Sequence, residues 1–245
     1  MGPVPNELER LQEQLGELLA ELALNGESAS TGEDPLQLVG AFGQLFEVMT
    51  RSEVDRIRAT TAVSAEHAQT AGELGEFAVE LLGKAARLVP AQDPARSEQL
   101  ALLRIGFAHW VLRQGGAIQR LEPIVDDLAM LANRADTPAV LADIGHVMLD
   151  LVDRATPEQR QDLEAGNPGR PWRLLHLNLG IVATRSRHPE LMEQAFKRLV
   201  QHLPQDAPQF FHQGMQQLQR GDYPESVRSI MSDYFQQWAG KPALH

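Results

Sequence analysis

A unit of 34 or 35 residues recurs in the C-terminal part of the chain and limits the folds that are open to the sequence. Each copy has a glycine in an apolar run, followed nine to twelve positions later by the dipeptide Pro-Glu. The glycines are Gly145, Gly180 and Gly214. The dipeptides are Pro157-Glu158, Pro189-Glu190 and Pro224-Glu225. A fixed period of this length is typical of repeated supersecondary units, so this part of the chain is expected to stack copies of one unit.

Each repeat unit is predicted to be a pair of helices. Proline is favoured in the first turn of a helix, and an acidic residue beside it faces the positive end of the helix dipole. Pro-Glu therefore predicts the start of the second helix, and the glycine in the first helix is expected to allow close backbone approach by a neighbour. Because one pair cannot bury its apolar face alone, the pairs are expected to stack.

The rest of the chain is also predicted to be helical. Leu, Ala, Glu and Gln dominate, while β-branched and aromatic residues are scarce, and straight-chain residues lose little rotamer freedom in a helix. The predicted fold class is all-α, with stacked antiparallel helix pairs that form an α-solenoid or an irregular helical bundle, and negligible β-structure. A chain of 245 residues buries a sizeable core in either arrangement.

Four regions are expected along the chain. They are an N-terminal amphipathic helix (1–25), a flexible linker (26–34), a helical bundle or hairpins (35–136) and the helical-pair repeats (137–240). The linker is predicted because its small, polar and helix-breaking residues offer no apolar face to bury. The last two regions are expected to be continuous and to form one domain.

The first predicted helix carries a seam of leucines at alternating steps of three and four: Leu8, Leu11, Leu15, Leu18 and Leu22. This is the spacing of the a and d positions of a coiled coil. Only about two heptads are present, fewer than the three or four that predict a coiled coil. The seam is therefore expected to pack on the rest of the chain or on a partner, with a homodimer through these leucines as a further option.

The repeats resemble tetratricopeptide repeats in period and in motif, over about residues 171–239. The matching residues of the last unit are two glycines, an aromatic, a small and a large apolar residue: Gly214, Gly221, Tyr223, Ser226 and Ile230. Those of the middle unit are Leu179, Gly180, Phe196 and Pro204. The first unit fits poorly, because its second helix (157–165) is short and polar. The resemblance implies a concave surface that binds a peptide or a protein.

Charge and composition narrow the expected partners. The formal net charge is −11, and such a field repels nucleic-acid phosphates and anionic membranes, so neither is an expected partner. The chain has no cysteine, which excludes disulfides, thiolate metal sites and cysteine nucleophiles. Residues 1–25 lack the pattern of a signal peptide, and no run approaches the roughly 18 apolar residues of a membrane span. A cytoplasmic location is the expectation.

The arginine-rich stretch 167–188 is the candidate binding surface of this acidic chain. Its candidate partner-binding residues are Arg170, Trp172, Arg173, His176, Arg185 and Arg187. Arginine with tryptophan is frequent at binding hot spots, and arginine suits a carboxylate or an acidic peptide. The alternative is that Trp172 packs in the core while the arginines neutralise neighbouring acids.

Metal and catalytic sites are not predicted. Asp143, His146 and Asp150 share one helical face at a spacing that can bind a divalent metal when a second helix completes the shell. Solvated charges on a helix face account for the same pattern, so no metal and no other cofactor is expected. No phosphate loop, GxSxG or EF-hand motif occurs, and nothing places a base beside a nucleophile. We therefore predict no catalytic residue.

Two functions fit these observations. The first is a non-catalytic adaptor or chaperone-like protein that binds a peptide or protein segment, with an acidic segment as one option. The second is an accessory protein that binds a small molecule or a metal in a pocket inside a helical bundle. An open groove would favour the first, and a closed apolar pocket with convergent polar groups would favour the second. An enzyme without a recognisable motif is a third option.

Overall fold

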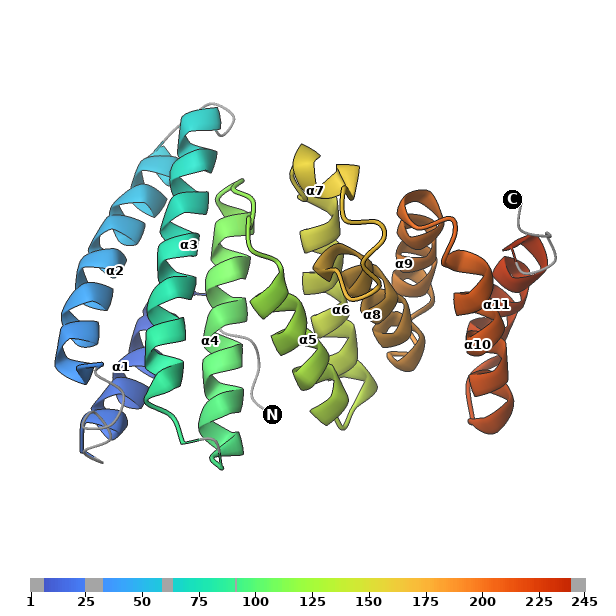
Figure 1. Ribbon diagram of the computed structural model, residues 1–245, viewed down its shortest axis with the longest axis horizontal. Helices are drawn as coiled ribbons and strands as arrows, with labels where there is room; N and C mark the ends of the chain where they lie inside the picture. Colours follow the sequence, from blue (N-terminus) through green and yellow to red (C-terminus); the bar gives the residue numbers. More distant parts are fainter. Residues whose placement is uncertain (1–6, 25–32, 59–63, 91, 239–245) are drawn as a thin grey trace. The chain divides into compact units, whose positions relative to one another are not determined.

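The computed structural model describes residues 7–24, 33–58, 64–90 and 92–238. These residues form eleven α-helices and no strand, which confirms the all-α prediction (Figure 1). The chain divides into two compact units, an N-terminal unit (Gly2–Leu128) and a C-terminal unit (Ala129–His245). Nearly all of the predicted linker lies outside the described residues, and so do residues 1–6 and 25 of the predicted N-terminal helix.

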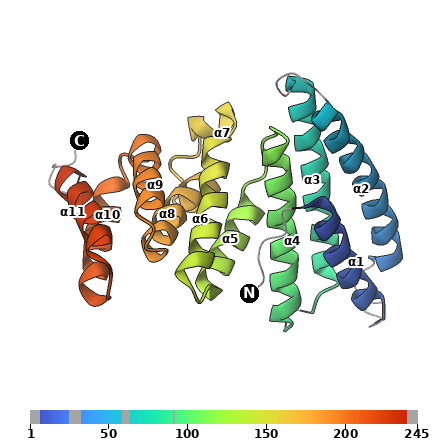
Figure 2. The same cartoon turned by 180° about the vertical axis from the view of Figure 1, so that it is seen from behind.

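The N-terminal unit is a closed bundle of four helices. They are α1 (Leu8–Leu24), α2 (Pro35–Arg58), α3 (Ala65–Arg87) and α4 (Pro94–Arg113). Each helix packs against the next, and α1 also packs against α4, which closes the ring (Figure 2).

The leucine seam of α1 is buried in this bundle. Its five leucines are at most 7% exposed, and Leu11, Leu18 and Leu22 are fully buried. The seam therefore packs on its own chain, which was one of the expected alternatives. A homodimer through the same side chains would require α1 to leave the bundle.

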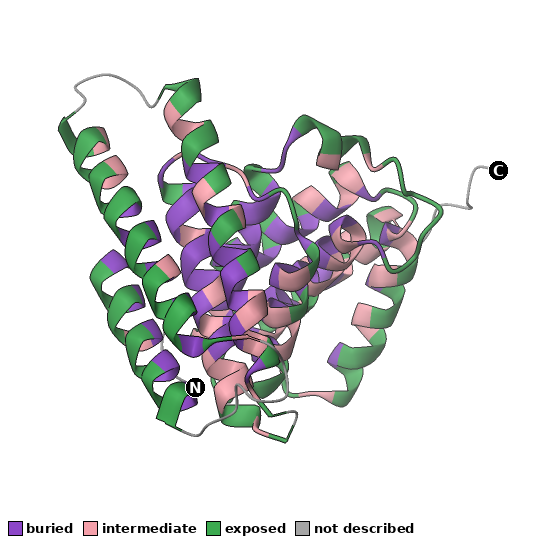
Figure 3. Ribbon diagram, turned by 60° about the vertical axis from the view of Figure 1, so that its left-hand side comes forward, coloured by how far each residue is buried: buried purple, intermediate pink, exposed green. Residues whose placement is uncertain are grey.

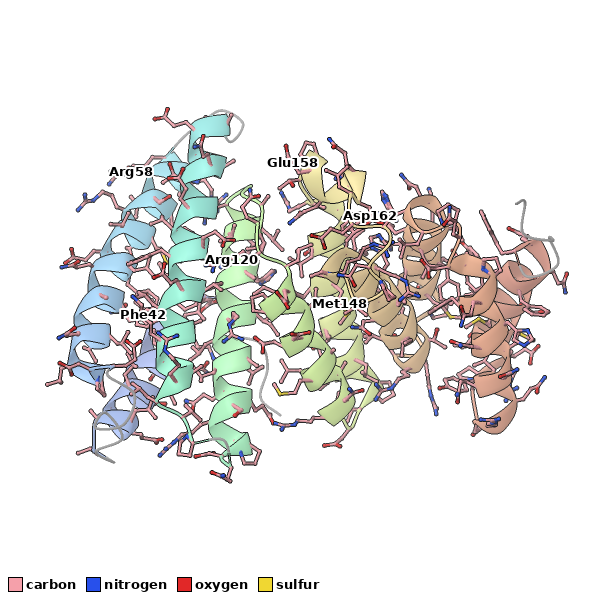
Figure 4. The ribbon with its side chains drawn as sticks, viewed as in Figure 1. Phe42, Arg58, Arg120, Met148, Glu158 and Asp162 are labelled. Atoms are coloured by element: carbon pink, nitrogen blue, oxygen red, sulfur yellow. The ribbon has the colours of Figure 1, made fainter. Side chains whose placement is uncertain are left out.

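Aromatic rings fill the bundle between α2 and α4. The rings of Phe42 and Phe46 lie 6.3 and 5.6 Å from the ring of Phe107 (Figure 4 labels Phe42). At the surface, Arg120 forms an ion pair with Glu76 of α3 at 2.8 Å, and this contact fastens the segment after α4 to the bundle.

The chain passes from the first unit to the second within α5 (Glu122–Arg134). Six helices follow in the C-terminal unit: α6 (Pro138–Asp153), α7 (Pro157–Gln161), α8 (Pro171–Arg185), α9 (Pro189–His202), α10 (Ala207–Arg220) and α11 (Glu225–Trp238). Helix α8 packs against α6 and α9, α10 packs against α11, and α11 packs against α9. The last two predicted helix pairs are thus present and adjacent, and a Pro-Glu dipeptide marks the start of each second helix.

The first pair differs from the other two, as its sequence predicts. Its second helix, α7, has only five residues, and none of them is buried. The helix ends at Gln161 and is capped by Asp162, whose φ of 47° is left-handed, and residues 162–170 then run irregularly to α8. A helix with no apolar residue has no face to pack, so it is not extended by tertiary contacts.

A bulky side chain from another helix packs against each of the three repeat glycines. A Cβ added at these positions would lie 2.5–2.7 Å from that side chain, so the side chain would have to shift to admit any other residue. The contacts join Gly145 of α6 to Leu191 of α9, Gly180 of α8 to Phe210 of α10, and Gly214 of α10 to Met231 of α11. A neighbouring helix does approach each glycine closely, but it does so with a side chain and not, as the sequence predicts, with its backbone.

Burial follows the amphipathic pattern of the helices. Buried positions lie on the faces that helices turn to their neighbours, and exposed positions cover the outer faces (Figure 3). Among the described helices, none combines the length and the apolar character that crossing a membrane requires.

Candidate functional site

Arg170 ties the irregular segment after α7 to the start of α8. Its Nη2 donates to Asp162 Oδ2 at 2.7 Å, its Nε donates to Oδ1 of the same carboxylate, and its Nη1 donates to the Asn167 carbonyl oxygen at 3.0 Å. The side chain is buried, and the hydrogen bonds to Asp162 raise the pKa of Arg170. Asp162 is labelled in Figure 4 in the segment that follows α7. Arg170 is thus held by a two-pronged ion pair with Asp162, and it also lines a pocket of about 480 Å³ together with Arg173.

Trp172 and His176 lie in the interior of the C-terminal unit. Trp172 is 5% exposed and His176 is fully buried, and their rings lie 4.2 Å apart. The half-buried ring of His202 packs 5.4 Å from Trp172 and 5.2 Å from His176. Neither Trp172 nor His176 reaches the surface that a partner would contact, as the core alternative expects for Trp172.

His176 is held as a neutral imidazole. Burial lowers its pKa to about 4, and this effect outweighs the hydrogen bond to the Trp172 carbonyl. The Nδ1–H group therefore donates to that carbonyl oxygen at 2.9 Å. Among the described residues, His176 Nε2 and Trp172 Nε1 have no hydrogen-bond partner.

Arg173 joins the starts of two helices. Its Nε donates to Asp206 Oδ1 at 2.8 Å and its Nη1 donates to the Pro168 carbonyl oxygen at 2.9 Å. Asp206 immediately precedes α10, so this half-buried ion pair connects the first turn of α8 to the first turn of α10. The arginine thereby neutralises a neighbouring acid.

Arg185 and Arg187 lie at the other end of α8, away from the ion-pair network. Arg187 is exposed, has a left-handed φ of 57° and stacks its guanidinium 5.8 Å from the ring centre of Tyr223. Arg185 is half-buried and makes no ion pair or hydrogen bond with any other described residue. The arginine-rich stretch therefore separates into a part whose arginines are held by ion pairs (170–173) and a part at the other end of α8 (185–187) that has no ion pair to another described residue.

Arg185 lines a groove of about 520 Å³ between α8 and α10. Its lining residues come from α8, from α10, from the segment between α10 and α11, and from α11: Ile181, Thr184, Arg185, Phe210, Gln213, Gly214, Gln216, Gln217, Tyr223 and Met231. The groove combines apolar side chains, three glutamine amides and one arginine. It lies wholly within the C-terminal unit.

The groove owes its shape to the repeat glycines. The ring of Phe210 rests on Gly180 and the side chain of Met231 rests on Gly214, so two apolar side chains form its base instead of filling it. Ile181 stands at the edge and is 47% exposed, although it is a large apolar residue.

Sequence reasoning missed most of this groove. It selected Arg185 but not Phe210 or the exposed glutamines Gln213, Gln216 and Gln217, which lie on one face of α10. Their spacing of three and four residues was visible, yet a polar helix face usually signals nothing more than contact with water. Ile181 of α8 lines the same groove.

The candidate metal face carries three exposed side chains, Asp143, His146 and Asp150. His146 Nδ1 hydrogen-bonds the Ala142 carbonyl oxygen at 2.7 Å, and its ring lies 5.8 Å from that of His188. Within the described part of the chain, no three His, Asp or Glu side chains converge as a metal site requires.

Comparison of the chain with protein-family models, with curated proteins and with solved structures finds no match.

Proposed function

We propose that this chain is a non-catalytic interaction protein, of the adaptor or chaperone-like kind, that binds a peptide or protein segment in the groove between α8 and α10. The observation that supports this proposal is the composition of the groove. Its apolar base suits an apolar side chain of the bound segment. The glutamine amides suit a peptide backbone, which needs both donors and acceptors, and Arg185 suits a carboxylate.

The openness of the groove favours a segment over an enclosed small molecule. Its volume falls in the range of roughly 300–1,000 Å³ that small-molecule sites also occupy. However, its glutamines are exposed and Ile181 is nearly half exposed, whereas a site for a small molecule usually buries most of its ligand. A bound segment would cover these side chains from outside.

We further propose that α8–α11 form two tetratricopeptide-like units. Three features support this assignment: the period, the matched glycines Gly180 and Gly214, and the proline that starts each second helix. In this arrangement the groove lies between the first helices of two successive pairs.

A peptide selection on the whole purified chain tests the proposal. We expect enrichment of peptides that pair an apolar residue with an Asp, a Glu or a free C-terminal carboxylate. In fluorescence polarisation, Arg185→Glu should weaken the best peptide about 30-fold, since a desolvated arginine at a hot spot is worth about 2 kcal/mol.

Arg220→Glu is the matched control, because Arg220 is an exposed arginine at the end of α10 and does not line the groove. It should bind the peptide like the wild type, apart from a small change that added salt removes. Failure to select any peptide, or equal losses from the two substitutions, would argue against the groove as the binding site.

A further inference from the structure

A second pocket of the C-terminal unit is lined mainly by cations. It has a volume of about 280 Å³ and lies where the end of α6, the short helix α7 and the last turns of α9 meet. Its charged residues are Asp153, Arg160, Lys197 and Arg198, and His202 stands beside them. It shares no residue with the α8–α10 groove, so any role it has is independent of the proposed function.

The single carboxylate of this pocket is already neutralised. Arg198 donates to both oxygens of Asp153, through Nε at 2.9 Å and through Nη2 at 2.8 Å. Within the described part of the chain, Arg160 and Lys197 then have no carboxylate partner. The pocket therefore retains two uncompensated positive charges in a chain whose formal net charge is −11.

Arg160 is held in place without losing its charge. Its Nη2 donates to the Asp153 carbonyl oxygen at 2.7 Å and its Nε donates to the Ala155 carbonyl oxygen at 3.1 Å. These two carbonyls belong to the last turn of α6 and to the residues just after it. The guanidinium is thus fixed by neutral partners, and its remaining Nη1 group is not engaged by any described residue. Such a donor binds an anion without first being reorganised.

The ring of His202 lies within the field of these cations. Burial lowers its pKa first, the positive charges of Arg160 and Arg198 lower it further, and Asp153 opposes them. On its inner side His202 packs against Trp172 and His176. An anion placed in the pocket would cancel the repulsion and make protonation of His202 easier.

We propose that this pocket binds a phosphate group through Arg160, Lys197 and Arg198. A phosphate carries close to two negative charges and three acceptor oxygens at neutral pH, which matches the two uncompensated charges of Arg160 and Lys197 better than a singly charged carboxylate does. Arginine presents a fork of donors to such oxygens, and lysine adds a mobile point charge.

Inorganic phosphate is the first probe, followed through the ring resonances of His202 by nuclear magnetic resonance. We expect a saturable shift on adding phosphate, and a higher pKa of His202 in its presence, while sodium chloride of equal ionic strength produces neither. Lys197→Gln should weaken the phosphate affinity about tenfold, as expected for one lost charge-assisted contact, and Lys197→Glu should abolish binding.

These substitutions are chosen because Lys197 is exposed, so both variants should fold. The matched control is Arg220→Gln, which removes an exposed cation that lines neither pocket and should leave the phosphate affinity unchanged. Glycerol 3-phosphate, and phosphatidylcholine vesicles with and without phosphatidic acid, then distinguish a dissolved phosphate from a lipid headgroup. A response to chloride equal to that of phosphate, or wild-type phosphate binding by Lys197→Glu, would overturn the proposal.

Discussion

The two units of this chain solve the same packing problem in different ways. In the N-terminal unit four helices close into a ring, and the apolar seam of α1 is buried against the neighbouring helices. In the C-terminal unit the helices are added in pairs, so the first helices of successive pairs leave a groove between them. A closed ring gains burial, whereas an open series of pairs retains surface that can be used for binding.

The two units also differ in how many polar side chains they bury. Among the described residues, the buried polar side chains lie mostly in the C-terminal unit: Thr156, Arg170, His176, Thr184 and Ser186, against Gln114 alone in the N-terminal unit. The C-terminal unit therefore depends on specific polar contacts that fix the geometry around its pockets. The N-terminal unit depends on hydrophobic burial.

Trp172→Ala probes the interior of the C-terminal unit and should have the largest effect. Removal of this buried ring should cost roughly 3–5 kcal/mol in the free energy of unfolding, measured by urea denaturation of the whole chain. Peptide binding in the α8–α10 groove should survive under conditions where the variant stays folded. A small stability loss with a large affinity loss would instead make Trp172 a contact residue.

Leu18→Ala probes the closure of the N-terminal ring. The side chain is fully buried, so its truncation should cost roughly 2–5 kcal/mol in the free energy of unfolding. Leu24→Ala is the control on the same helix, since Leu24 is 86% exposed and should change stability by less than about 0.5 kcal/mol. Similar losses in the two variants would mean that α1 does not close the ring.

The pH dependence of stability should have opposite signs in the two units. Burial holds the pKa of His176 at about 4 instead of 6.5. The unfolded chain therefore binds the proton first, and the stability contributed by neutral His176 is lost as the pH falls from 6.5 to 4.

Asp127 of the N-terminal unit behaves in the reverse way. Burial raises its pKa from 3.8 to about 6, against the opposing effect of its ion pair with Arg104. The stability contributed by protonated Asp127 is present below pH 3.8 and is lost as the pH rises to 6.

The titration of His176 and that of Asp127 each change the free energy of unfolding by at most about 3 kcal/mol. Hydrogen exchange resolved by segment, between pH 4 and 6.5, should show the C-terminal unit weakening and the N-terminal unit strengthening on acidification. His176→Gln and Asp127→Asn should each flatten one of the two trends. If both units weakened or both strengthened on acidification, the trends could not be assigned to His176 and Asp127.

Gly180→Ala and Gly43→Ala make the same change in the two units and should have opposite, smaller effects. A Cβ at Gly180 would lie 2.5 Å from the Phe210 ring, so overpacking should cost roughly 1–3 kcal/mol. At Gly43, on an exposed position of α2, nothing lies within 4 Å, and alanine should stabilise the helix by about 0.5–1 kcal/mol. Thermal unfolding of both variants measures the difference, and equal signs would refute the packing described for Gly180.

Sequence reasoning succeeded where the signal is local. The glycine and Pro-Glu pattern predicted the helix pairs, and the polar composition of residues 157–165 predicted the weak second helix of the first pair. It could not predict that Arg170 and Arg173 would meet Asp162 and Asp206. The partner of Arg173 lies 33 positions away, and the contact depends on how α8 and α10 pack, which no local pattern encodes.

The glycine contacts also determine how this chain can be lengthened by gene duplication. The side chain that packs against each repeat glycine belongs to a different helix of the array. It comes from the second helix of the next pair for Gly145, from the first helix of the next pair for Gly180, and from the second helix of the same pair for Gly214. The units share a period but are not interchangeable modules. An in-frame copy of any one unit would present its glycine to a side chain of the wrong size or origin, so growth of the array requires compensating substitutions at Leu191, Phe210 or Met231.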